Sequence, residues 1–132
     1  MAEHFLTGYI NKLAKLMGVD NWHITIRHGS TDDISSYAET TLWDERFRAD
    51  IVLRADWEPS SKEELREILA HEVIHLHFAA LDQAFQSTKE LLGKPLYLAV
   101  GDRYRTDREK AVQQIAHFWA PYLPLPPRLR ES

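Results

Sequence analysis

The stretch Leu69–Phe78, LAHEVIHLHF, places three histidines and a glutamate in an otherwise apolar run. His71 and His75 are four residues apart, so on an α-helix they project from the same face, one turn from each other. Two imidazoles in that arrangement can bind one metal ion at about 2 Å, the usual zinc–nitrogen distance. Glu72 lies about 100° further round the helix, where a carboxylate can polarise a metal-bound water without binding the metal. The pattern predicts a hydrolytic metal centre.

The residues around this pattern predict that its helix is buried. Almost no polar face is left by the surrounding apolar side chains Leu65, Ile68, Leu69, Val73, Ile74, Leu76, Phe78 and Leu81. Buried imidazoles and a buried carboxylate without partners are strongly unfavourable, and a divalent cation removes that cost. The alternative is an amphipathic helix that carries these residues by chance. His77 points away from the His71–His75 pair, so we expect it to be a packing or surface residue.

Composition limits both the metal ligands and the partners. The chain has 132 residues, no cysteine and a net charge of −4. This length suits one domain, and the lack of cysteine leaves His, Asp and Glu as metal ligands and fits a reducing compartment. The sequence has no stripe of Lys and Arg and no apolar run of about 18 residues. We therefore expect a cytoplasmic protein that binds neither nucleic acid nor membrane.

The elements that must position the motif form an α+β pattern. Apolar residues at helical spacing predict an amphipathic helix over Phe5–Met17, which we interpret as a helix and not as a signal peptide. Alternating apolar residues then predict three strands, over Trp22–His28, Tyr37–Trp43 and Phe47–Arg54. The short links between them predict a small three-stranded, mainly antiparallel sheet ahead of the motif helix.

Downstream of the motif the sequence predicts further helices. A short helical piece is expected over Phe85–Gly93, and the last helix over Thr106–Trp119. The segment Lys94–Gly101 between them is ambiguous between a short strand and a packed loop. We expect residues 1–120 to form a single catalytic domain, and residues 121–132, which are rich in proline, to form an extended tail.

With these elements in this order, the chain resembles the zincin metallopeptidases, which carry the motif HExxH. It lacks the later glycine and histidine of the Met-turn group, and Leu81 stands about where the SprT-like group has a histidine. It is most similar to the gluzincins, whose third ligand is a glutamate on a downstream helix. Compact ImmA/IrrE-type zincins and minimal single-domain gluzincins have this layout of a helix, a small sheet, the motif helix and a glutamate helix.

The resemblance implies a third zinc ligand and a role for each motif residue. Glu109 lies 34 residues after His75 and matches the downstream glutamate. Gln113 stands where larger gluzincins carry an aspartate that supports a zinc-binding imidazole, and its amide carbonyl can accept the same hydrogen bond. Other residues remain open as the third ligand, namely Asp102, Asp107 and His117.

The implied activity is zinc-dependent hydrolysis of peptide bonds in a protein or peptide substrate. Glu72 acts as the general base, taking a proton from the attacking water and giving it to the leaving amine. The oxyanion that forms needs a further donor, and the candidates are Tyr97, Tyr104 and His117. The alternatives are a zincin fold without turnover, as a latent or regulatory module whose tail lies in the cleft, and a structural or non-peptidase metal site.

The strand FRADIVLR, residues 47–54, is expected to dock the substrate. Zincins similar to this chain use the edge strand before the motif helix in this way, and an open edge offers backbone groups to an extended peptide. Arg48 and Asp50 have the charges typical of an edge that is kept from pairing with itself. Asp50 and Val52 are the positions at which a proline would test this docking.

Overall fold

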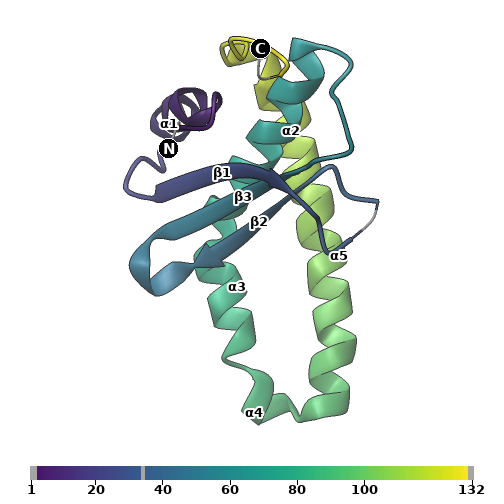
Figure 1. Ribbon diagram of the computed structural model, residues 1–132. Helices are drawn as coiled ribbons and strands as arrows, with labels where there is room; N and C mark the ends of the chain where they lie inside the picture. The colour runs from purple at the N-terminus through teal and green to yellow at the C-terminus, as the bar shows by residue number, and fades with distance from the viewer. Residues whose placement is uncertain (1–2, 34, 131–132) are drawn as a thin grey trace.

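A three-stranded sheet and two long helices surround the motif in the computed structural model (Figure 1), which describes residues 3–33 and 35–130. The elements in chain order are α1 (Thr7–Leu16), β1 (His23–Gly29), β2 (Ala38–Trp43), η1 (Asp44–Arg46), β3 (Arg48–Arg54), α2 (Lys62–Ile74), η2 (His75–Phe78), α3 (Ala79–Gln86), α4 (Lys89–Leu92), α5 (Lys94–Trp119) and η3 (Ala120–Tyr122), where η marks a 3₁₀ turn. The α+β class expected from the sequence is confirmed.

The sheet is mixed, with the strand order β1–β3–β2. β3 runs parallel to β1, with Ile26 opposite Ile51, and antiparallel to β2, with Thr40 opposite Ile51. The expectation of a mainly antiparallel sheet is therefore wrong for one of the two pairings. The alternation of apolar residues shows which face of a strand is buried, but it does not show which strands are neighbours.

β3 is the central strand, so the prediction that it forms an open edge is wrong. Both sides of β3 are paired, and its residues Arg48, Asp50 and Val52 do not border an unpaired edge. Asp50 instead accepts hydrogen bonds from its neighbours on β1, from Thr25 Oγ1 at 2.8 Å and from Arg27 Nε at 3.2 Å. The charge of Asp50 thus pairs across the strands with Arg27, and the open edges of the sheet belong to β1 and β2.

The motif helix α2 is fixed at its start and buried along one side. The hydroxyl of Ser61 accepts from the backbone N–H of Glu64 at 3.1 Å, and the Glu64 carboxylate accepts from the backbone N–H of Ser60 at 2.8 Å. These bonds satisfy donors at the helix start that have no partner within the helix. Completely buried side chains from α1, β3 and α2 meet in one core, including Ile10, Leu13, Ile51, Leu65, Leu69 and Val73.

The helix α5 has 26 residues and includes the segment Lys94–Gly101 that was ambiguous in the sequence. Together α3, α4 and the first half of α5 form a hairpin that projects from the sheet-bearing body (Figure 1). Phe85 stacks on both Tyr97 and Tyr104, with ring centroids 5.0 and 4.9 Å apart. This stack sets how α5 returns past α2. None of the helices in residues 3–33 and 35–130 is long and apolar enough to cross a membrane.

The proline-rich segment is packed against the domain. Leu123 and Pro126 are buried. The Tyr9 hydroxyl donates to the backbone carbonyl of Pro124 at 2.7 Å, and Arg66 Nη1 donates to that of Leu123 at 3.1 Å. Residues 121–130 therefore belong to the same folded unit as α1 and α2, while Glu131 and Ser132 lie outside the described residues.

The central position of β3 predicts that a proline at Val52 destabilises the whole domain. Val52 pairs with Glu39 of β2 and is buried, so a proline at this position removes a ladder hydrogen bond and leaves its acceptor on β2 without a donor. We expect a loss of at least about 1–3 kcal/mol in the free energy of unfolding, measured by urea denaturation. Ala38→Pro on the edge strand β2 is the control, and equal losses for both variants would contradict this strand order.

Candidate metal centre

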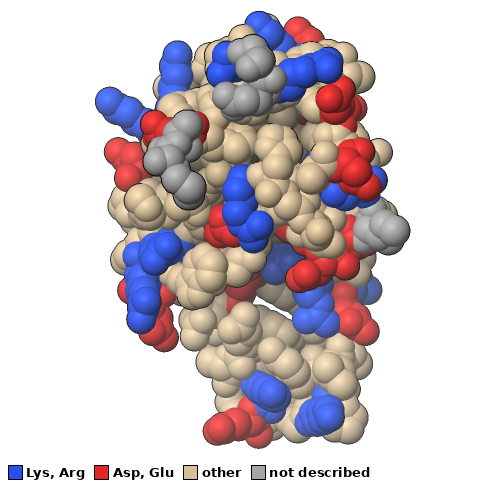
Figure 2. Space-filling model, in the orientation of Figure 1, with Lys and Arg blue, Asp and Glu red and all other residues tan. Residues whose placement is uncertain are grey.

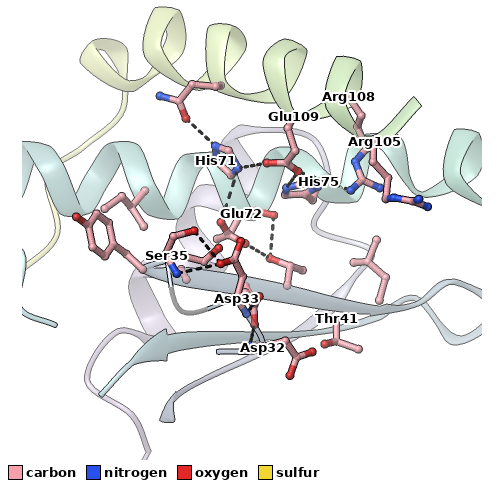
Figure 3. Close-up of a pocket in the computed structure, with 18 of the residues that line it drawn as sticks. Asp32, Asp33, Ser35, Thr41, His71, Glu72, His75, Arg105, Arg108 and Glu109 are labelled. Carbon is pink, nitrogen blue, oxygen red and sulfur yellow. Dashed lines mark hydrogen bonds and ion pairs between the residues drawn. The ribbon is translucent and has the colours of Figure 1, made fainter. Parts of the chain in front are cut away.

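Three side chains from the motif and from α5 converge in the wall of a cleft (Figure 3). Nε2 of His71 lies 3.3 Å from Oε2 of Glu109, and Nε2 of His75 lies 3.0 Å from Oε1 of the same carboxylate. Ligand atoms of these three residues all lie within 4.8 Å of one another, close enough to hold one metal ion. The three predicted ligands are thus brought together, although 34 residues separate His75 from Glu109.

The two histidines keep their common face although the helix changes type between them. α2 ends at Ile74, and His75 is the first residue of the 3₁₀ turn η2. The two imidazole centroids are 5.2 Å apart. His77 is turned away and exposed, with Nε2 2.7 Å from the backbone carbonyl of Met17, so its expected role outside the metal cluster is confirmed.

Gln113 orients the imidazole of His71. Nδ1 of His71 lies 2.9 Å from Oε1 of Gln113, which is the contact expected from the sequence. The amide nitrogen of Gln113 donates to the carboxylate of Glu67 at 3.3 Å, so its carbonyl oxygen faces the histidine. With the proton of the neutral ring on Nδ1, the lone pair of Nε2 points to the cluster, as a metal ligand requires.

Glu72 is buried beside the cluster, with 5% of its surface exposed. Its Oε1 accepts from the hydroxyl of Thr40 on β2 at 2.7 Å, and its Oε2 lies 3.9 Å from Nε2 of His71. Burial raises the pKa of Glu72, while nearby His75 and the Thr40 hydroxyl act in the opposite direction. A carboxyl whose pKa is raised above its ordinary value holds a proton more readily, as a group that takes up and releases a proton must.

The protonation of the metal-free cluster is set by its own contacts. Hydrogen bonds from His71, and then from His75, hold the pKa of Glu109 well below its usual range. Burial acts to lower the pKa of His71, but the hydrogen bond to Glu109 and the charge of Glu72 outweigh it and raise the pKa. The His71 imidazole therefore holds its proton more tightly than a free imidazole does, and a cation bound at this nitrogen would have to displace that proton.

The cleft has a volume of about 800 Å³ and lies between β2 on one side and α2 and α5 on the other. Figure 2 shows the surface hollowed between the sheet-bearing body and the helical hairpin. The N–H of Arg54 donates to the carbonyl of Tyr37, so by antiparallel alternation Ala38, Thr40 and Leu42 turn their backbone groups to the open side. The edge strand that borders the cleft is β2.

The other ligand candidates lie outside the cluster. Asp102 pairs with Arg105 at 2.9 Å, and Asp107 pairs with Arg103 at 2.8 Å. His117 is also not part of the cluster, and its ring lies 3.2 Å from the Glu67 carboxylate. Within the described residues, the geometry favours Glu109 as the third member.

The oxyanion candidates do not line the cleft. Tyr97 and Tyr104 stack on Phe85 in the hairpin, and His117 is exposed on α5. The cleft is instead lined by two arginines of α5, Arg105 and Arg108.

Two residues were missed in the sequence: Arg108, which lies beside the cluster, and Thr40, which contacts Glu72. Arg108 directly precedes the predicted ligand Glu109, and this adjacency is the one signal that the sequence contains for it. Thr40 had no signal, because its contact with Glu72 depends on the strand order.

Comparisons of the chain with protein-family models, with curated proteins and with solved structures find no match.

The raised pKa of Glu72 predicts a pH-dependent gain in stability when this carboxyl is removed. The folded protein holds the Glu72 proton more tightly than the unfolded chain, so stability falls as pH rises from the ordinary carboxyl pKa to the raised one. In a chelator, Glu72→Gln should be more stable than the parent at neutral pH, and the difference should vanish below about pH 4. Urea unfolding across pH measures this.

The control for this comparison is Glu63→Gln, which removes one exposed charge from the first turn of the same helix. The expected pH dependence is absent from that variant. Equal stability of Glu72→Gln and the parent at neutral pH would contradict the burial argument.

Proposed function

We propose that this protein is a zinc-dependent metallopeptidase in which His71, His75 and Glu109 bind the metal and Glu72 is the general base. The observation that carries the proposal is the convergence of two imidazoles and a carboxylate beside a buried glutamate, in the wall of an open cleft.

The donor set fits zinc. Two imidazole nitrogens and one carboxylate oxygen are a known ligand set of catalytic zinc sites, which keep a fourth position for water or substrate. Structural zinc sites normally close all four positions with protein ligands. In residues 3–33 and 35–130 no fourth His, Asp or Glu joins the group, which favours a catalytic site over a structural one.

Each residue around the cluster has a task in the proposed reaction. When bound, zinc polarises the carbonyl of the substrate and lowers the pKa of a water molecule. Glu72 accepts a proton from the attacking water and passes it to the nitrogen of the leaving amine. Thr40 holds the Glu72 carboxylate by its 2.7 Å hydrogen bond, and Gln113 holds the ring of His71.

The proposed substrate is an extended peptide or an unfolded segment of protein. The backbone groups of Ala38, Thr40 and Leu42 on β2 offer the free edge of the sheet to a peptide that lies in the cleft. The described part of the proline-rich segment, residues 121–130, packs against α1 and α2 and does not line the cleft, so it gives the latent alternative no support. Because the chain has no cysteine, we place the enzyme in the reducing cytoplasm.

The proposal predicts that Glu72→Gln abolishes hydrolysis without removing zinc. Loss of the general base should lower the turnover of an unfolded protein or of a peptide library by about 10²–10⁴-fold. Zinc content is measured on the same samples, and Glu63→Gln on the same helix is the control. Hydrolysis by Glu72→Gln at the rate of the parent would show that Glu72 is not the base.

A further inference from the structure

Arg108 is a cation in the wall of the cleft that the proposed reaction has not yet used. Its side chain is 20% exposed and it lines the cleft beside the metal-binding cluster (Figure 3). Nη2 of Arg108 lies 3.7 Å from Oε1 of Glu109, and this oxygen lies 3.0 Å from Nε2 of His75. The guanidinium group is thus next to the place where the reacting atoms must lie.

We propose that Arg108 stabilises the negative charge that develops on the carbonyl oxygen of the scissile peptide bond. This inference rests on the proposed peptidase function. Arg108 takes the role for which the sequence suggested Tyr97, Tyr104 or His117.

A network in the hairpin holds the guanidinium in place before any substrate arrives. Nη1 of Arg108 pairs with Oδ1 of Asp82 at 3.1 Å, and the Tyr104 hydroxyl donates to the same oxygen. The guanidinium carbon lies 5.9 Å from the centre of the Tyr104 ring, which in turn stacks on Phe85. Burial and the bond to Asp82 raise the pKa of Tyr104 to about 12, so the phenol remains a donor.

The Nη2 end of the guanidinium has capacity for an incoming oxygen. Its 3.7 Å separation from Glu109 is too long for a hydrogen bond, whereas Nη1 is committed to Asp82. One end of the side chain is therefore anchored and the other faces the cluster. A donor that is fixed in advance stabilises a developing charge without reorganising at the moment of reaction.

The charge in question exists only between the two bond changes of hydrolysis. The water oxygen forms a bond to the carbonyl carbon, the C=O π pair moves onto the carbonyl oxygen, and Glu72 takes the water proton. The carbonyl then re-forms, the C–N bond breaks, and Glu72 gives the proton to the amine. One water is consumed, and a carboxyl group and an amine are formed. A group that contacts the oxyanion but not the unreacted substrate raises kcat and leaves KM nearly unchanged.

Arg105 is the matched control on the same helix. It also lines the cleft, but its side chain is 49% exposed and pairs with the exposed Asp102 at 2.9 Å. Its partner Asp102 is 83% exposed, whereas Asp82, the partner of Arg108, is 17% exposed. Replacing Arg105 therefore tests the effect of removing a positive charge from the cleft where the side chain is not held in a fixed position.

The experiment measures kcat, KM and zinc content for Arg108→Ala, Arg108→Lys and Arg105→Ala. We expect Arg108→Ala to lower kcat about 10²–10³-fold with KM and zinc content close to those of the parent. Arg108→Lys, which keeps the charge beside Asp82, should recover part of kcat, and Arg105→Ala should resemble the parent. Tyr104→Phe tests the positioning network and should lower kcat alone, by a smaller factor.

A second readout does not depend on turnover. A phosphinic peptide carries a tetrahedral, negatively charged centre, so its affinity for the protein should fall in parallel with kcat/KM across the Arg108 variants. The matching ordinary peptide, which the Glu72→Gln variant binds without cleaving, is the control. Its affinity should be the same for Glu72→Gln and for the double variant that also carries Arg108→Ala. If Arg108→Ala does not fold, Arg108→Lys decides the question by the same two readouts.

Other results would overturn the inference. Unchanged kcat in well-folded Arg108→Ala would show that Arg108 serves only to neutralise Asp82. A loss confined to KM, and to substrates with a free C-terminal carboxylate, would show that Arg108 anchors that carboxylate. If the parent hydrolyses peptides and either of these results is found, only the proposed role of Arg108 is overturned. If the zinc-loaded parent hydrolyses nothing, the proposed function is overturned as well.

Discussion

The contact of one carboxylate with two imidazoles is the interaction on which the rest of the structure depends. Glu109 reaches both His71 and His75, so α5 must pass α2 at a fixed height and a fixed rotation. The hairpin of α3 and α4 carries the chain away from the motif and returns it as α5 (Figure 1). The stack of Phe85 on Tyr97 and Tyr104 fixes the register of that return. Packing in the hairpin thus helps to position the third member of the cluster.

The polar side chains around the cluster form hydrogen-bonded pairs, which hold the members of the cluster and Glu72 in place. A buried carboxylate is unfavourable unless it is hydrogen-bonded, and Glu72 has the Thr40 hydroxyl as its partner. His71 is held by Gln113, which is in turn held by Glu67. These contacts leave the cluster ordered and its imidazole Nε2 atoms directed to one point. His71, His75 and Glu109 lie close enough together that they could hold one metal ion.

Local patterns in the sequence predicted the parts of the site that depend on local geometry. The four-residue spacing of His71 and His75 is enough to place both rings on one face, whatever the rest of the fold. The resemblance to gluzincins then added Glu109 and the contact of Gln113 with His71. Thr40 and Arg108 could not be found in this way, because their contacts depend on the strand order and on the hairpin.

The sequence predicted those features of the fold that follow from which residues are buried. It did not predict the features that depend on which elements pack next to each other. Apolar alternation located three strands, but it could not show that β3 lies between the other two. In Lys94–Gly101 the residues Leu96, Leu98 and Val100 alternate like a strand, and all three are exposed on α5. There the helix is favoured by Pro95 in its first turn and by the packing of Tyr97 on Phe85. Prolines predicted an extended tail, but not that Pro126 would be buried.

Titration of the metal-free protein with zinc, followed by calorimetry, tests the central claim most directly. The account predicts one zinc per chain in the parent and in Asp107→Asn, no tight binding in His71→Ala or His75→Ala, and markedly weaker binding in Glu109→Gln. Asp107 is a matched control because it lies on the same helix, two residues from Glu109, and pairs with Arg103. Unchanged stoichiometry and affinity in His71→Ala, His75→Ala and Glu109→Gln would contradict the metal centre.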